Sequence, residues 1–227
     1  MDKASPWHWI RRHKWLLLLI GITCLLVVSP ISEIYARRDD VISPLTAGVL
    51  LAVTMGTAEK PRTIWCFSLL ILAWLSISVL TEGSGLFAQE SLVAPILFMI
   101  LLMAIFALLV RWLIRVVRID MEVLCAAICG YLLVGILWTG FYALIMVADN
   151  HALTSTTNAQ IDLGDLLYFS YTTLTTTGFG DILPKNPIMR MCAVVEAIVG
   201  IFYNTIVIAR FVGLYGIKPV SSGVSRD

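Results

Sequence analysis

Long apolar runs separated by short polar stretches dominate the hydropathy pattern of this 227-residue chain. Six runs have the length and composition of membrane-spanning helices, at about residues 15–31, 41–57, 62–80, 92–117, 121–148 and 187–215. Hydrophobic residues make up 59% of the sequence, and the mean hydropathy is +0.90. The pattern predicts an all-α membrane protein with six transmembrane helices, in contact with a lipid bilayer.

The region between the fifth and sixth runs breaks this pattern. Residues 149–164 are polar and suit an extracellular loop, and residues 165–175 are too short to span a membrane. Asp162 or Asp165 lies near the expected start of this short helix, where a negative charge is favoured. Non-helical backbone at membrane depth is tolerated only where it is buried in protein or lines a wet cavity. We therefore expect a re-entrant pore helix and a filter loop between the fifth and sixth helices.

Candidate chemistry lies in the nine residues 173–181, which read Thr-Leu-Thr-Thr-Thr-Gly-Phe-Gly-Asp. An ion filter replaces the water around a cation by protein oxygens. This requires successive backbone carbonyls to point the same way, which ordinary strands do not achieve. Gly178 and Gly180 adopt the necessary backbone angles at little steric cost, and Thr176 can add a hydroxyl oxygen at the inner mouth. The segment therefore predicts a cation filter.

About residues 121–215 resemble the two-helix pore module of tetrameric potassium channels, of the voltage-gated-type superfamily and prokaryotic type. The filter segment is similar to their Thr-Val-Gly-Tyr-Gly-Asp loop, with Thr177 and Phe179 replacing valine and tyrosine. The resemblance implies a filter formed by Thr176, Thr177, Gly178, Phe179 and Gly180, with K+ bound at the first four. It also assigns filter support to Thr172, Thr175, Asp181 and Tyr168. Asp181 matches an aspartate that braces the filter, whereas Tyr168 and Phe169 replace a tryptophan pair.

Four filter strands are needed to encircle an ion, and one chain supplies one strand. We therefore expect a homotetramer on a four-fold axis that conducts K+ passively. A nonselective monovalent cation channel stays open as an alternative, because Thr177 and Phe179 depart from the commonest filter. K+ in the filter is the expected ligand. No organic cofactor, nucleic acid or soluble partner is predicted, and the net charge of +1 argues against a nucleic-acid role.

The sixth run carries a polar and small stripe, since Glu196, Gly200 and Asn204 are spaced four residues apart. A carboxylate within a membrane segment is costly and is a functional candidate. Two orientations are open to Glu196: it faces an inner cavity, or it points sideways and hydrogen-bonds the base of the pore helix, as an ionised or a protonated carboxyl. Gly200 is either a hinge of the inner helix or a close packing contact. Asn204 either lines the cavity or bonds across helices.

The distribution of basic residues predicts the orientation in the membrane. If the N-terminus is cytoplasmic and the helices alternate, 12 of the 16 Lys and Arg lie on or near the inner side. Those outside are Arg37, Arg38, Lys185 and Arg190. This asymmetry predicts a multi-pass plasma-membrane protein (inner membrane in a bacterium) with both termini cytoplasmic. The rival interpretation, a cleaved signal peptide at residues 11–28, lacks a clear small-x-small cleavage site.

Four regions follow from this layout. Residues 1–14 form a basic cytoplasmic N-terminus, 15–118 a four-helix membrane domain of unknown role, 119–216 the pore domain, and 217–227 a short cytoplasmic tail. Arg111, Arg115 and Arg118 are spaced four and then three residues apart and crowd the inner end of the fourth helix. Because the outer part of that helix carries no charge, the pattern favours inner-leaflet anchoring over strong voltage sensing.

Two non-channel functions receive less support. A potassium transporter with a degenerate filter carries four pore loops in one long chain, whereas this chain has one. A membrane-embedded enzyme needs paired or clustered catalytic groups at membrane depth. His8, His13 and His151 all lie outside the apolar runs, and Glu196 stands alone in its run. We therefore expect a protein that is not an enzyme.

Overall fold

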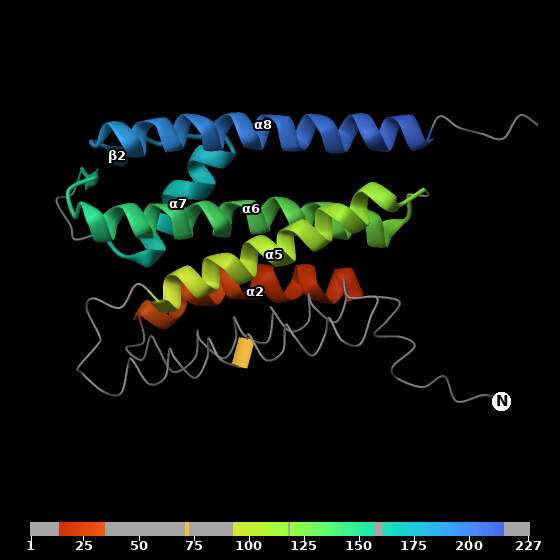
Figure 1. The fold of residues 1–227 in the computed structure, drawn as a ribbon, viewed down its shortest axis with the longest axis horizontal. Coiled ribbons are helices and arrows are strands. Elements are labelled where there is room, and N and C mark those ends of the chain that lie inside the picture. The colour runs from red at the N-terminus through yellow and green to blue at the C-terminus, as the bar shows by residue number, and fades with distance from the viewer. Residues whose placement is uncertain (1–13, 35–70, 73–92, 118, 157–160, 216–227) are drawn as a thin grey trace, which may run out of the picture.

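The computed structural model describes residues 14–34, 71–72, 93–117, 119–156 and 161–215 (Figure 1). This part of the chain holds α2 (Lys14–Ile34), α5 (Val93–Arg115), α6 (Met121–Ala148), α7 (Leu163–Leu174) and α8 (Pro187–Tyr215). It also holds two short strands, β1 (Leu153–Ser155) and β2 (Ile182–Pro184). Apart from the helical pair Ile71 and Leu72, the predicted helices at 41–57 and 62–80 lie outside the described residues.

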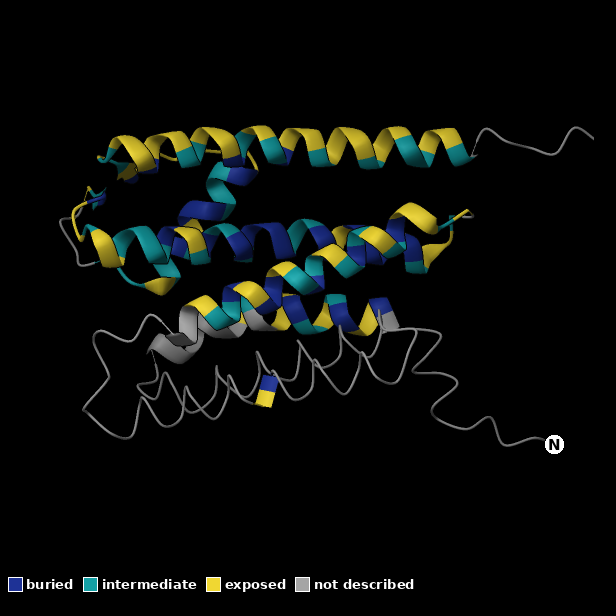
Figure 2. Cartoon of the chain, in the orientation of Figure 1, coloured by how far each residue is buried: buried dark blue, intermediate teal, exposed yellow. Residues whose placement is uncertain are grey.

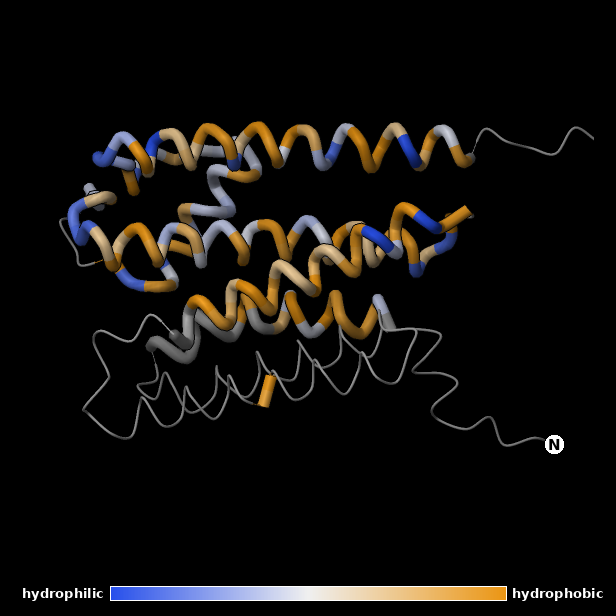
Figure 3. Tube along the Cα trace, in the orientation of Figure 1, coloured by the Kyte–Doolittle hydropathy of each residue, from blue (hydrophilic) through white to orange (hydrophobic). Residues whose placement is uncertain are grey.

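Four of the predicted runs are confirmed as helices, with bounds that differ from the hydropathy pattern by a few residues. Three helices in the described part are long and apolar enough to cross a membrane, namely Ile96–Arg115, Met121–Ala148 and Pro187–Leu214. Apolar residues run the whole length of α5, α6 and α8 (Figure 3). Within these helices the backbone groups are bonded internally, which is what a spanning segment requires in lipid.

The helices stack in layers on either side of α6 (Figure 1). On one side α2 and α5 pack against α6, and a cluster of buried residues from these three helices includes Trp15, Ile105, Ala126 and Cys129. On the other side the short helix α7 crosses the space between α6 and α8. α6 is thus the central element, and 61% of an apolar 18-residue stretch of this helix is buried.

One end of the stack gathers the N-terminus of α2, the C-terminus of α5, the N-terminus of α6 and the C-terminus of α8. The ring centroids of Trp15 and Trp112 lie 4.8 Å apart, and the backbone N–H of Trp15 donates to Glu122 Oε2 at 3.1 Å. Arg210, near the end of α8, donates to the Ile114 carbonyl at 2.6 Å. α2 therefore runs away from this end of the stack, and α5 runs back to it.

α8 differs from the other long helices because most of its surface is uncovered (Figure 2). Only 11% of an apolar 18-residue stretch of α8 is buried. Its exposed large apolar side chains are Ile188, Met191, Val194, Val195, Ile198, Ile201, Phe202, Ile206, Ile208 and Val212. Such a continuous apolar surface on a helix needs lipid or protein to cover it.

Candidate pore and filter

A capping box fixes the start of α7, the helix that leads into the predicted filter. The Asp165 N–H donates to Asp162 Oδ1 at 2.9 Å, and the Asp162 N–H donates to Asp165 Oδ2 at 3.2 Å. Both carboxylates thus satisfy N–H groups that the first turn of a helix leaves unpaired. The prediction that Asp162 or Asp165 lies at this N-terminus is confirmed, with Asp162 as the N-cap.

The segment that follows α7 has an alternating backbone. Thr176, Gly178 and Gly180 have φ angles of 58°, 54° and 80°, whereas Thr177 and Phe179 between them keep negative φ. Alternation of left-handed with ordinary conformations turns successive peptide groups the same way, which a regular strand does not do. Glycine adopts positive φ without steric penalty, but Thr176 does not, so its conformation must be held by its surroundings.

The N–H groups of this segment point back to the end of α7. The Thr177 and Gly178 N–H groups both donate to the Thr172 carbonyl, at 2.8 and 3.1 Å, and the Thr176 N–H donates to the Thr173 carbonyl at 2.9 Å. The hydroxyls of Thr175 and Thr177 share a further hydrogen bond of 2.8 Å. Thr172 and Thr175, two of the predicted support residues, therefore contact the filter segment directly.

The carbonyl side of the same segment is open. Within the described part of the chain, no group donates a hydrogen bond to the carbonyl oxygens of residues 176–180. Residues 175–181 are all exposed, and the Phe179 side chain is 70% exposed. A short backbone segment thus presents a row of unpaired acceptors, which water, a cation or another protein chain can satisfy.

Side chains of α7 brace the outer end of this segment. The rings of Tyr168 and Phe179 are stacked, with centroids 6.2 Å apart and planes inclined by 5°. The Asp181 side chain lies within electrostatic reach of the Tyr168 hydroxyl. The Asp181 carbonyl accepts from the Thr156 N–H at 2.9 Å, which ties the segment to the loop after α6. The structure therefore brings Tyr168, Phe179 and Asp181 together.

A two-stranded sheet and one side-chain bond close the rim of the site. β1 pairs antiparallel with β2 in the register Leu153↔Pro184, so the predicted loop 149–164 contains a strand that the sequence analysis missed. Asn186 Nδ2 donates to Asp149 Oδ2 at 2.7 Å and joins the end of α6 to the start of α8. This bond is the main reason why the pKa of the Asp149 carboxyl lies below its ordinary value.

Glu196 is fully buried and points at α6 and α7. Ser170 Oγ lies 2.5 Å from Glu196 Oε1, and the Tyr142 hydroxyl donates to Glu196 Oε2. The first expected orientation, with the carboxyl in an inner cavity, is therefore wrong for this structure. The physical reason is that a carboxyl at membrane depth is costly without polar partners, and α6 and α7 provide them.

Gly200 and Asn204, the other residues of the predicted stripe, lie near the end of α7. A Cβ atom at Gly200 would lie 2.2 Å from the Leu174 carbonyl oxygen, so the backbones of α8 and α7 meet there. The Tyr131 hydroxyl donates to the same carbonyl at 3.1 Å and lies near the Asn204 side chain. The structure thus shows close packing at Gly200, in a helix that continues unbroken on both sides of it.

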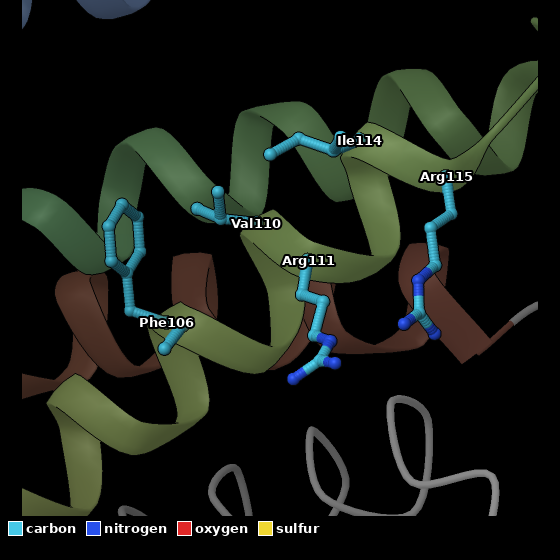
Figure 4. A pocket seen from close by; sticks show the side chains of 6 residues that line it. Phe106, Val110, Arg111, Ile114 and Arg115 are labelled. Carbon is cyan, nitrogen blue, oxygen red and sulfur yellow. The ribbon is translucent and has the colours of Figure 1, made fainter.

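The basic residues near the predicted inner end take two arrangements. Arg210 Nη2 donates to the carbonyls of Ile114 and Val116, at 2.6 and 2.9 Å, and so connects α8 to the end of α5. Arg111 and Arg115 are exposed, lie in the last two turns of α5, and point away from α6 (Figure 4). They flank an open, mainly apolar pocket on this helix. Arg118 lies outside the described residues.

Sequence reasoning did not find the side chains that hold α7 in place. Tyr142 and Ser170 bind Glu196, Tyr131 binds the Leu174 carbonyl, and the Tyr171 hydroxyl donates to the Leu132 carbonyl at 2.8 Å. The usable signal was the lone carboxylate, because a buried carboxyl requires hydroxyl or amide partners on neighbouring helices.

Residues 123–215, somewhat under half of the chain, match the family model described as ion channel. The match covers α6, the filter segment and α8, and it supports an ion channel of the pore-module kind in a membrane protein. No curated protein and no solved structure matches the chain.

Proposed function

We propose that this chain is a subunit of a homotetrameric channel that conducts K+ passively and selectively. The observation that carries the proposal is the backbone of residues 176–180. Positive φ recurs at every second residue, the N–H groups of Thr177 and Gly178 bond back to α7, and the carbonyls remain unpaired. Rows of backbone carbonyls that replace the hydration shell of an ion are the basis of K+ filters. Thr176, Thr177, Gly178 and Phe179 would hold the ions.

The uncovered surfaces of the chain support a four-fold assembly. One chain provides one row of carbonyls, and an ion must be coordinated from several sides. The exposed filter segment and the exposed apolar surface of α8 lie on the side of the stack away from α2 and α5 (Figure 2). Association of four copies about an axis on that side would cover α8 and converge the four filter segments.

The arrangement of helix ends supports six spans with both termini on one side. α2 ends and α5 begins at the same end of the stack, which agrees with the two further helices that hydropathy predicts between them. Lys14 begins α2, Arg111 and Arg115 lie in the last two turns of α5, and Arg210 lies in the last two turns of α8. These helix ends lie at the end of the stack opposite β2 (Figure 1). Since positive charge favours the cytoplasmic side, the filter would open to the outside of the plasma membrane.

Cation flux through purified protein in lipid vesicles tests the proposal, with K+ and Na+ compared at several voltages. We expect K+-selective flux with weak voltage dependence. Equal flux of K+ and Na+ would instead identify a nonselective cation channel. A protein that neither conducts nor forms a tetramer under these conditions would refute the proposal.

A further inference from the structure

Three hydroxyl or carboxyl groups from three helices meet in one dry site beside the pore helix. Glu196 comes from α8, Ser170 from α7 and Tyr142 from α6, and each of them is 0% exposed. The Tyr142 hydroxyl bonds Glu196 Oε2, and Ser170 Oγ lies 2.5 Å from Glu196 Oε1. Ser170 Oγ also lies 2.8 Å from the carbonyl oxygen of Gly135 on α6. The site thus links α6, α7 and α8, which pack against one another beside the filter segment.

The number of protons in this cluster depends on the charge of Glu196. The Ser170 hydroxyl has one proton and contacts two acceptors, the Gly135 carbonyl and the Glu196 carboxyl. A carbonyl oxygen cannot donate. Each Ser170 contact therefore has a proton of its own only if Ser170 donates to Gly135 and the carboxyl of Glu196 donates to Ser170; otherwise the two acceptors share the single hydroxyl proton. In the first arrangement the Tyr142 hydroxyl donates to the other carboxyl oxygen, and every polar atom is satisfied.

The surroundings of the cluster favour the neutral form as well. Among the residues that the structure describes, the other titratable groups whose electrostatic influence reaches Glu196 or its Tyr142 partner are Tyr131, Tyr171 and Cys192. None of them carries a positive charge, and no described Lys or Arg forms a salt bridge with Glu196. A buried carboxylate without a cationic partner is strongly unfavourable, whereas a buried carboxylic acid with full hydrogen bonding is not.

We propose that Glu196 is a neutral carboxylic acid that acts as a positioning residue, donating a hydrogen bond to Ser170 and accepting one from Tyr142. Ser170 lies one turn before Leu174, the last residue of α7, and the filter segment begins just beyond it. By bonding α7 to both α6 and α8, the acid fixes where the filter stands between the two spanning helices. The inference deepens the proposed function, since it concerns the support of the same filter.

The test compares Glu196→Gln with Glu196→Ala in the full-length protein. A glutamine amide has the hydrogen-bonding pattern of the neutral acid, because its N–H can donate to Ser170 and its oxygen can accept from Tyr142. We expect Glu196→Gln to keep the assembly and the K+ flux of the wild type. Glu196→Ala leaves Ser170 and Tyr142 without their partner, and we expect it to lower the population of folded assembly by about tenfold or more.

Infrared difference spectroscopy of the wild type against Glu196→Gln supplies a readout that does not require conduction. We expect the wild type to show the C=O stretching band of a protonated carboxylic acid, sensitive to deuterium exchange, which Glu196→Gln lacks. A carboxylate band in its place would overturn the proposal. A Glu196→Gln protein that fails to assemble would overturn it too, because the amide preserves every bond of a neutral acid. If the acid band is present but the wild type conducts no ions, the function fails while this inference stands.

Discussion

Gly200→Ala tests the contact between α8 and the end of α7. In the wild-type structure the space for a Cβ atom is occupied, since the Leu174 carbonyl oxygen would lie 2.2 Å from it and two further Leu174 atoms 3.1 Å away. Real Cβ atoms essentially never approach closer than 3.0 Å. The two backbones must therefore part by about 0.8 Å, and a backbone oxygen cannot rotate away as a flexible side chain can.

The expected cost can be estimated from three contributions. Forcing an extra methyl group into a packed contact costs about 1–3 kcal/mol. Displacing the Leu174 carbonyl weakens its 3.1 Å bond to Tyr131, which is a loss of about 1 kcal/mol. Alanine is the better helix former by about 1 kcal/mol, which offsets part of the loss. We expect a net destabilisation of about 1–3 kcal/mol per chain.

Gly213→Ala is the matched control, because Gly213 lies in the same helix and a Cβ atom there would meet nothing within 4 Å. It gains helix propensity alone, so we expect stability that is unchanged or raised by up to about 1 kcal/mol. The assay is denaturation of the purified assembly together with K+ flux in vesicles. Gly200→Ala should lower both stability and flux, since Leu174 immediately precedes the filter. Stability and flux equal to those of Gly213→Ala would refute the reasoning.

Four further predictions concern the filter and its neighbours. Gly178→Ala places a side chain at φ 54°, which costs about 1–2 kcal/mol per chain. Because the new Cβ atom has no neighbour within 4 Å, we expect the assembly to persist while K+ flux is lost. Normal K+ flux would contradict the proposed filter. Tyr168→Leu and Phe179→Leu each remove the same stacked ring pair, so the double variant should denature no more readily than the more affected single variant. Additive effects would argue against the pair. Arg210→Ala removes two hydrogen bonds to the end of α5 and should lower the free energy of unfolding by about 1 kcal/mol. Denaturation of the purified assembly measures this change, with Arg210→Lys as the control that keeps the charge. Replacing K+ by Na+ should lower the temperature at which the assembly dissociates, because a ligand that binds only the folded state stabilises it; an identical temperature in both ions would argue against K+ sites.

The sequence alone determined the described helices and much of the backbone of the proposed filter segment. A segment in lipid must satisfy its backbone hydrogen bonds internally, so an apolar run of sufficient length is a helix whatever packs against it. This is why α5, α6 and α8 lie where hydropathy predicts them. The positive φ of Gly178 and Gly180 is similarly local, since glycine alone adopts it freely. The N-cap Asp162 follows from the same short-range chemistry.

Tertiary structure decided which groups these elements present to one another. Helical periodicity placed Glu196 and Gly200 on one face of α8, but it did not say whether that face meets a cavity or a neighbouring helix. The answer depends on Tyr142, 54 residues away from Glu196, and on Ser170, 26 residues away. The positive φ of Thr176 likewise needs its contacts with α7, since threonine does not choose that conformation by itself. Such pairings depend on how whole helices pack, because a sequence pattern fixes the face of a helix and not its partner.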